Sequence, residues 1–285
     1  MFRPEGRERL PLVVWVHGGG WIGGTRTQMR EYLQIIAGAG YVAVGLDYSH
    51  APRRHHPVQA RQVNTALRYL TSLEDSYGID PQRVVLAGDS AGAQIAAQVA
   101  AAHVDPSYAR AIGLVPALRP GQIRAAVLMC GAYDLTGPLG RGVQARILHA
   151  ALWAYAGIRN YRTDPAFGYA SVLYHLTPDY PPAFVTAGDT DPVLPQSREL
   201  VERLDALGVA TSPLFPDAGT GAGHEYHLDL DTEPAAHALT QLLAHLAERT
   251  SPLEGSTYDS APVPTGLPVG RVDLGAPDGG QQHGE

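Results

Sequence analysis

Short apolar runs of strand length alternate with helix-length segments along most of this chain. The apolar runs lie at residues 12–17, 41–47, 83–87, 125–130, 182–187 and 210–215. Helices are expected at residues 28–39, 58–76, 91–103, 196–207 and 233–249. This alternation predicts an α/β fold with a mostly parallel central sheet and helices on both faces. Near-continuous apolar strands are typical of a sheet that is buried on both sides.

Composition and spacing divide the chain into three parts. The alternating region, residues 10–250, predicts one domain with a sizeable core, since 45% of the chain is hydrophobic. Within it, residues 137–180 interrupt the alternation with a helix expected at 143–155 and a tyrosine-rich loop, which we interpret as a small lid or pocket wall. Residues 1–9 form a charged N-terminal segment. Residues 251–285 are rich in Pro, Gly, Ser and Asp without an apolar face, so we expect a disordered tail.

Charge and residue usage exclude several classes of function. The net charge is −7 and the arginines are scattered, which argues against a nucleic-acid partner. All 21 basic residues are arginine, and the missing lysine removes pyridoxal Schiff-base, Walker-type and Ser-x-x-Lys chemistry. We expect no cofactor. The lone Cys130 cannot form an intrachain disulfide, and we find no signal or membrane segment, so a cytoplasmic location is the expectation.

A serine between two glycines follows the third apolar run. The motif Gly88-Asp89-Ser90-Ala91-Gly92 leads directly into the alanine-rich segment 91–103. A nucleophilic serine needs a sharp strand-to-helix turn that exposes its hydroxyl above a helix N-terminus, and larger flanking residues would clash there. The pattern therefore predicts a nucleophile elbow with Ser90 at its tip.

A run of glycines follows the first apolar run, in His17-Gly18-Gly19-Gly20-Trp21. Glycines after a strand expose backbone N–H groups without side-chain obstruction, which is what an oxyanion hole requires. The N–H of the residue after the nucleophile, here Ala91, donates as well in such sites.

With these two motifs the sequence resembles the α/β-hydrolase superfamily, and within it the hormone-sensitive-lipase-like and related microbial esterases. Those esterases carry His-Gly-Gly-Gly-Trp and Gly-Asp-Ser-Ala-Gly, and the resemblance extends over most of residues 11–249. It implies that Gly19, Gly20 and Ala91 donate to the oxyanion. It also implies that His17 is a structural residue of the glycine loop.

A serine nucleophile needs a base, and the base needs an acid that holds its tautomer. In the family's chain order of serine, acid and histidine, residues 188–194 (Gly-Asp-Thr-Asp-Pro-Val-Leu) resemble the acid loop. We expect Asp191 to be the acid and Asp189, the second candidate, to be a turn residue that caps the loop. Two histidines, His224 and His227, lie in the loop after the last apolar run. The family's histidine stands two residues before an aromatic, so His224, followed by Tyr226, fits as the base.

The other histidines receive no chemical role. We interpret His227 as a surface or pocket-lining residue, and His55 and His56 as members of a solvated loop. The latter two lack carboxylate or cysteine partners at ligand spacing, so we predict no metal site.

The N-terminal region departs from the family's pattern. The lipase-like branch carries a helical cap before its glycine loop, whereas 16 residues precede His17 here, so we expect no such cap. Residues 1–6 look like the tail of the hairpin that commonly opens this fold, which would leave a sheet edge uncovered. An uncovered edge favours association, so a homodimer is a further expectation.

Together these features predict a serine carboxylesterase that cleaves small acyl or aryl esters. Trp21, Tyr133 and Tyr226 are expected to wall the substrate pocket, with Trp153 and Tyr169 as further candidates. An arylformamidase-type amide hydrolase is the alternative, and a small-peptide peptidase has less support. From another class, the chain could be a non-catalytic ligand-binding protein on a hydrolase scaffold, against which the presence of all three expected triad residues argues.

Overall fold

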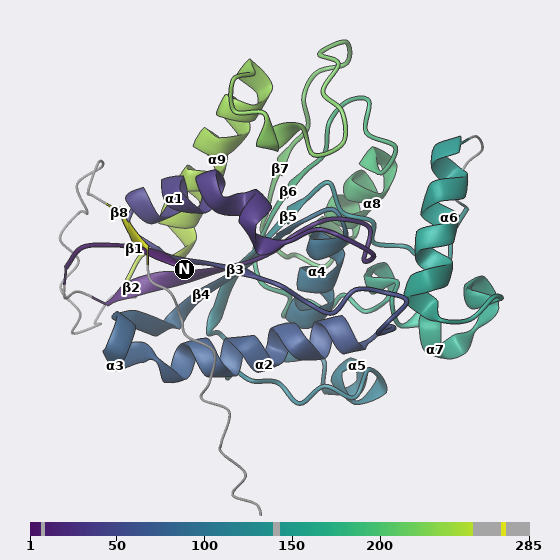
Figure 1. The fold of residues 1–285 in the computed structure, drawn as a ribbon, viewed down its shortest axis with the longest axis horizontal. Helices are drawn as coiled ribbons and strands as arrows, with labels where there is room; N and C mark the ends of the chain where they lie inside the picture. Colours follow the sequence, from purple (N-terminus) through teal and green to yellow (C-terminus); the bar gives the residue numbers. More distant parts are fainter. Residues whose placement is uncertain (7–8, 139–142, 253–268, 272–285) are drawn as a thin grey trace, which may run out of the picture.

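An eight-stranded sheet runs through the centre of the computed structural model, which describes residues 1–6, 9–138, 143–252 and 269–271 (Figure 1). The strands are β1 (Phe2–Pro4), β2 (Leu10–Val16), β3 (Val42–Leu46), β4 (Ile79–Asp89), β5 (Ile123–Met129), β6 (Ala183–Thr186), β7 (Thr211–Leu214) and β8 (Val269–Arg271). Their order is β7-β6-β5-β4-β2-β3-β1-β8. All neighbouring pairs among strands β2 to β7 are parallel, and β1 pairs antiparallel with both β3 and β8. The mostly parallel sheet and all six expected strands are confirmed.

Helices connect these strands. They are α1 (Arg30–Gly38), α2 (Val58–Ser72), α3 (Glu74–Tyr77), α4 (Ala91–Val104), α5 (Pro106–Ala111), α6 (Val143–Ala156), α7 (Pro165–Gly168), α8 (Leu194–Ala206) and α9 (Glu233–Arg249). Short 3-10 turns are η1 (Arg26–Met29), η2 (Tyr161–Thr163), η3 (Val172–Tyr174) and η4 (Tyr226–Leu228). The helix expected over 58–76 is divided at Leu73 into α2 and α3. Among the described helices, none is both long and apolar enough to cross a bilayer.

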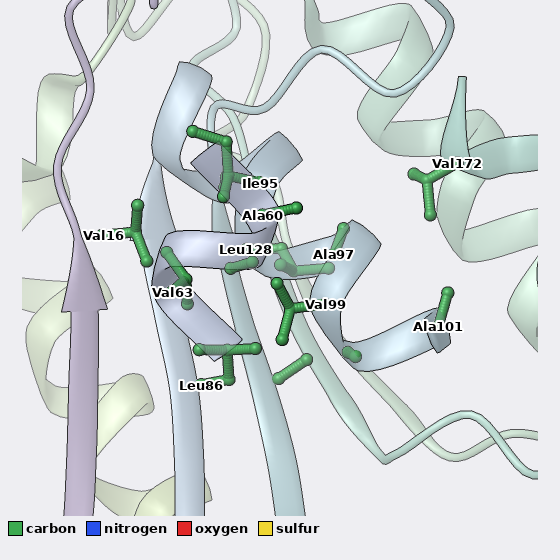
Figure 2. Packing of buried hydrophobic residues seen from close by; sticks show 14 of the residues in the cluster. Val16, Ala60, Val63, Leu86, Ile95, Ala97, Val99, Ala101, Leu128 and Val172 are labelled. Atoms are coloured by element: carbon green, nitrogen blue, oxygen red, sulfur yellow. The ribbon is translucent and has the colours of Figure 1, made fainter. Parts of the chain in front are cut away.

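Alternate residues of the strands enter two separate cores. Leu12, Val14 and Val16 belong to the cluster that includes α2 and α4. Val13 and Trp15 belong to the cluster on the opposite face, with α1 and α9. Figure 1 shows the same three layers, and Figure 2 shows residues of α2 and α4 packed beside the strands. Because side chains of a strand alternate between faces, a fully apolar strand needs helices on both sides, and the structure supplies them.

The expectation of an uncovered sheet edge is wrong, because β1 pairs with β3. Phe2 of β1 pairs with Ala43 of β3 and is buried in the α1 and α9 core. Beyond β1, residues 269–271 add β8, so the expectation of disorder is wrong for these three residues. Residues 253–268 and 272–285 of the expected tail, and residues 7–8, lie outside the described residues.

The segment expected to form a lid contains α6, η2, α7 and η3 and projects from one side of the sheet in Figure 1. The ring of Tyr155 in α6 stacks on Trp21 of the glycine loop, with centroids 4.9 Å apart. Gln94 of α4 donates from its side-chain amide to the carbonyl of Ala170 at 2.9 Å. These contacts place the segment against the glycine loop and against α4, the helix that follows the elbow motif. Its role as a lid remains a prediction.

Candidate active site

Ser90 stands at the carboxyl end of β4, where the chain turns into α4. Its backbone has φ 50° and ψ −119°, a left-handed conformation that non-glycine residues rarely adopt. A Cβ at Gly92 would lie 2.0 Å from the Val16 carbonyl oxygen, and one at Gly88 would lie 2.5 Å from the Gly92 carbonyl carbon. The turn thus tolerates no larger residue at either flank, in agreement with the argument from the sequence. The Ser90 N–H donates to the Met129 carbonyl at 2.8 Å, which helps to hold the turn.

The structure brings Ser90, His224 and Asp191 together, as the sequence predicted. The distance from Ser90 Oγ to His224 Nε2 is 2.8 Å. His224 Nδ1 lies 2.9 Å and 3.0 Å from the two carboxylate oxygens of Asp191. The Asp191 side chain has no exposed surface, whereas the His224 side chain is 38% exposed. This arrangement can pass a proton from the hydroxyl to the imidazole while the carboxylate stabilises the resulting imidazolium.

The surroundings of His224 favour its protonated form. Burial alone would lower the pKa of His224, but the hydrogen bond and negative charge of Asp191 outweigh burial, and the pKa is raised above 6.5. A base with its pKa near the working pH suits proton transfer in both directions.

Asp189, the second acid candidate, instead caps the loop that leads to His224. Its carboxylate accepts hydrogen bonds from the N–H groups of Gly219, Gly221 and Ala222 at 2.9, 3.2 and 2.7 Å. The turn role predicted for Asp189 agrees with these contacts.

The glycine loop folds back on itself at the carboxyl end of β2. The Gly19 carbonyl accepts from the N–H groups of Ile22 and Gly23 at 3.2 and 3.0 Å, and Gly19 has φ 109°. A Cβ at Gly19 would lie 2.3 Å from the Gly23 carbonyl oxygen, so the position requires glycine. Among the hydrogen bonds of the described residues, no acceptor takes the N–H groups of Gly19, Gly20 or Ala91. These three groups are therefore available to an anionic oxygen.

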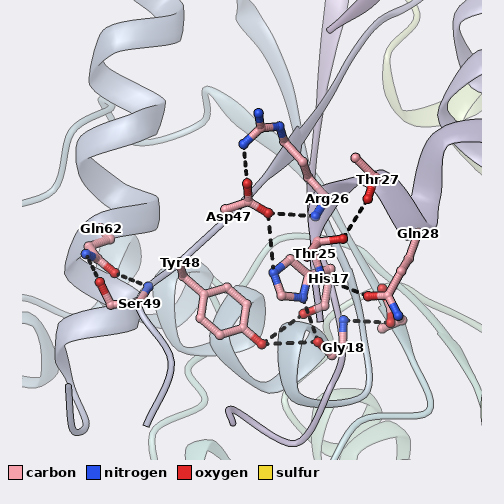
Figure 3. A network of polar contacts seen from close by, with 11 residues as sticks. His17, Gly18, Thr25, Arg26, Thr27, Gln28, Asp47, Tyr48, Ser49 and Gln62 are labelled. Atoms are coloured by element: carbon pink, nitrogen blue, oxygen red, sulfur yellow. Dashed lines mark hydrogen bonds and ion pairs between the residues drawn. The ribbon is translucent and has the colours of Figure 1, made fainter. Parts of the chain in front are cut away.

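A polar network fixes the start of this loop (Figure 3). The buried His17 ring stacks on Tyr48, with centroids 4.5 Å apart, and the Tyr48 hydroxyl donates to the carbonyls of His17 and Gly18. Asp47 accepts from both the backbone N–H and the guanidinium of Arg26. Burial lowers the pKa of His17, which keeps the ring neutral. His17 thus lies in the interior of the loop, as the resemblance implies.

The sequence did not lead us to assign a role to two carboxyl groups beside the site, those of Asp89 and Glu225. Asp89, inside the elbow motif, accepts from Trp15 Nε1 at 2.6 Å and from the Gly18 N–H at 2.7 Å. Burial, reinforced by the charge of Glu225, raises the pKa of Asp89 to about 7. For Asp89, the only sequence signal of an unusual carboxyl group was its place next to Ser90, at the end of a run that must be buried.

Burial argues against the prediction that Trp21, Tyr133 and Tyr226 wall a substrate pocket, which stays a prediction. Their exposed fractions are 2%, 0% and 8%, so they present almost no surface to a ligand. Trp21 donates to the side-chain carbonyl of Gln94 at 2.9 Å, and the Tyr226 hydroxyl lies 2.6 Å from Thr186 Oγ1. Aromatic rings bury large areas, and their polar atoms find partners inside the fold. Trp153 and Tyr169, the further candidates, are 51% and 37% exposed.

Two histidines also lie deeper than expected. His227 is fully buried, and burial with the charge of His224 lowers its pKa to about 3. His56 Nε2 lies 2.9 Å from the Gln98 side-chain nitrogen, and burial lowers the pKa of His56 to about 3. The expectation of a surface or pocket-lining His227 is wrong. His56 is half-buried rather than fully solvated, whereas His55 is exposed.

One group of side chains in the described residues has metal-ligand spacing. Donor atoms of Cys130, Asp191 and His224 lie within 4.8 Å of one another. Asp191 and His224 are already hydrogen-bonded to each other, and burial raises the pKa of the Cys130 thiol. A thiol binds metal as thiolate, so we assign no metal to this group.

Comparisons with known proteins agree with this architecture. A family model described as alpha/beta hydrolase fold matches residues 13–227. Esterase LipC of Mycobacterium tuberculosis (strain ATCC 25618 / H37Rv) is 29% identical over 238 residues, covering 82% of this chain and 58% of LipC. Esterase LipQ of the same strain is 30% identical over 213 residues, covering 71% of this chain and 48% of LipQ. The chain thus spans about half the length of the curated relatives it matches.

Among solved structures, an esterase of Pyrobaculum calidifontis superposes with a TM-score of 0.72 at 25% identity. The superposition covers 86% of this chain and 79% of that protein. The similarity therefore extends over most of both folded domains.

Proposed function

Because the chain belongs to the α/β-hydrolase family, we propose that it is a serine hydrolase, a carboxylesterase that cleaves small acyl or aryl esters. The observation that carries the proposal is the continuous hydrogen-bonded series from Ser90 through His224 to the buried Asp191. The names of LipC, LipQ and the Pyrobaculum protein as esterases support the ester class.

The proposed reaction proceeds through an acyl-enzyme. Ser90 Oγ attacks the ester carbonyl carbon while its proton moves to His224 Nε2, and Asp191 stabilises the imidazolium. The negative charge that develops on the carbonyl oxygen is bound by the N–H groups of Gly19, Gly20 and Ala91. When the tetrahedral intermediate collapses, His224 returns the proton to the leaving alkoxide. Water then attacks the acyl-enzyme by the same steps, releases the acid and restores Ser90.

Hydrolysis of p-nitrophenyl esters from acetate to decanoate, with N-formylkynurenine alongside, tests this proposal. Activity on short esters that falls about a millionfold in Ser90→Ala would support it. A strong preference for the formamide would move the assignment to an arylformamidase. A wild-type protein that neither hydrolyses these compounds nor reacts with a fluorophosphonate probe would point to the non-catalytic binding protein.

Location and assembly are part of the same proposal. A cytoplasmic location is supported by Cys130, the chain's only cysteine, which is buried and unpaired. A homodimer remains a prediction that size-exclusion chromatography tests. At the β7 end of the sheet, Pro213 lacks the N–H that pairing with a second copy would use. This proline therefore disfavours a dimer formed by pairing along β7.

A further inference from the structure

Two carboxyl groups meet beneath the glycine loop, next to the proposed nucleophile and base. Asp89 directly precedes Ser90, and Glu225 directly follows His224. Glu225 is half-buried and has φ 58°, a strained conformation that turns it away from the extended path of the loop. The two acids therefore belong to the two loops whose relative position sets the Ser90–His224 distance.

Gly18 shows how closely the two carboxyl groups approach. A Cβ at Gly18 would lie 2.4 Å from Asp89 Oδ2 and 2.4 Å from Glu225 Oε1, so the two oxygens flank the same point. Two oxygens that each lie 2.4 Å from one point are at most 4.8 Å apart, and a side-chain hydrogen bond with Glu225 is among the causes that raise the pKa of Asp89. Two carboxylates this close repel each other strongly unless one of them keeps a proton.

We propose that Asp89 and Glu225 share one proton, and that this carboxyl–carboxylate hydrogen bond positions the His224 loop against the Ser90 elbow. This inference rests on the proposed function, since it assigns both acids as positioning residues of that site. The proton bonds to one carboxyl oxygen and is accepted by the other carboxylate, so the pair carries one negative charge. When the proton leaves for water, two carboxylates remain and the hydrogen bond is lost.

The surroundings explain why the proton is held. Burial and the neighbouring Glu225 raise the pKa of Asp89 to about 7, against the opposing hydrogen bonds from Trp15 and Gly18. Titratable groups that face the pair from the packed elements are His17, Tyr32, Tyr48 and His224. Burial raises the pKa of both tyrosines and lowers that of His17, so these three are uncharged near pH 7. His224 alone in this set can carry a compensating positive charge.

A consequence for activity follows. As pH rises through about 7, the second carboxylate forms, the loops lose their hydrogen bond, and the added charge stabilises protonated His224. Both effects lower the fraction of protein molecules whose active site is competent above neutral pH. Glu225→Gln keeps a donor toward Asp89 at every pH and removes one charge, so it should abolish this loss.

The test compares Glu225→Gln, Glu225→Ala and the control Asp229→Asn, which removes a charge from the same loop. The readout is kcat/KM for p-nitrophenyl butyrate at about pH 8.5 divided by that at about pH 6. We expect this ratio to be about threefold or more higher in Glu225→Gln than in wild type, and unchanged in Asp229→Asn. Glu225→Ala should lose about tenfold at pH 6, where Glu225→Gln retains activity. Equal ratios in wild type and Glu225→Gln would overturn the proposal, whether or not Glu225→Ala folds.

A second readout does not depend on catalysis. In the Ser90→Ala background, the melting temperature should fall as pH rises from about 4 to about 7 with Glu225 present, because a buried acid with a raised pKa loses its stabilising contribution between its unfolded-state pKa, about 4, and its raised pKa in the fold. With Gln at position 225 this fall should be smaller. Identical pH dependence in both proteins would overturn the shared proton even if no ester is hydrolysed. Conversely, an inactive wild type that shows the expected melting difference would refute only the esterase proposal.

Discussion

Gly92→Ala probes how tightly the elbow is packed. The added Cβ would lie 2.0 Å from the Val16 carbonyl oxygen and 2.5 Å from that of His17. Both atoms belong to the backbone of β2 and its exit, so neither can rotate away. Relief requires that α4 and β2 separate by about 1 Å, and forced overpacking of this kind costs about 1–3 kcal/mol.

Alanine also has a higher helix propensity than glycine, which offsets the clash by up to about 1 kcal/mol. Gly168→Ala provides the matched control, because Gly168 is also helical and a Cβ there meets nothing within 4 Å. The difference in free energy of unfolding between the two variants therefore isolates the clash, and we expect Gly92→Ala to be less stable than Gly168→Ala by about 1–3 kcal/mol.

Denaturant unfolding measures this difference, and ester hydrolysis measures its effect on the site. Because Ser90 and Ala91 move with the start of α4, a shift of about 1 Å should lower kcat/KM about 100-fold. The control should keep wild-type activity. Equal stability of the two variants, together with wild-type activity of Gly92→Ala, would refute the argument that close backbone approach dictates the elbow glycines.

Three further predictions concern the site. Asp191→Asn should lower kcat about 10⁴-fold with little change in melting temperature, because the amide cannot hold the His224 tautomer or stabilise its cation; undiminished turnover would exclude Asp191 as the acid. Because neutral imidazole is the base, kcat/KM should rise with pH through the pKa of His224. Burial lowers this pKa, but Asp191 outweighs burial and raises it above 6.5, so a rise in kcat/KM centred below pH 6.5 would contradict the argument. Tyr133→Phe should leave KM across the ester series within about twofold, because the ring is fully buried, and a tenfold rise would restore its predicted place in the pocket wall.

The resemblance selected Asp191 and His224 among the candidates, but the sheet, and the meeting of these residues with Ser90, have a common physical reason. Parallel strands buried on both faces appear in the sequence as apolar runs, and their carboxyl ends lie at one edge of the sheet. A motif that follows each run is therefore brought to the same place, however far apart the motifs lie in the chain.

Other features depend on packing that no local pattern encodes. Trp21 is buried because Tyr155 of α6 stacks on it and Gln94 of α4 accepts from its indole, and Tyr133 is fully buried as well. Their sequence neighbours do not reveal this burial. The three-residue strand β8 pairs across more than 260 residues with β1 and has too short a pattern to recognise.

Two short helices were missed although the sequence carries their signal. In Asp105-Pro106 and Asp164-Pro165, the aspartate caps a helix whose first residue is the proline. Proline suits the first helical position because its missing N–H has no intrahelical partner there. The pattern of an acidic cap and proline would have predicted α5 and α7.

Backbone strain gives an independent indication of where the chemistry lies. Within the described ranges, the non-glycine residues with positive φ are Trp21, Ser90, Cys130 and Glu225. Each such position costs about 1–3 kcal/mol and persists only where its surroundings hold it. Short backbone hydrogen bonds hold Ser90 and Cys130, and the indole N–H of Trp21 donates to Gln94. The proposed carboxyl pair with Asp89 would hold Glu225. All four follow a strand or the proposed base at the edge where Ser90 lies, so strain is concentrated where a site must be preorganised rather than spread over the fold.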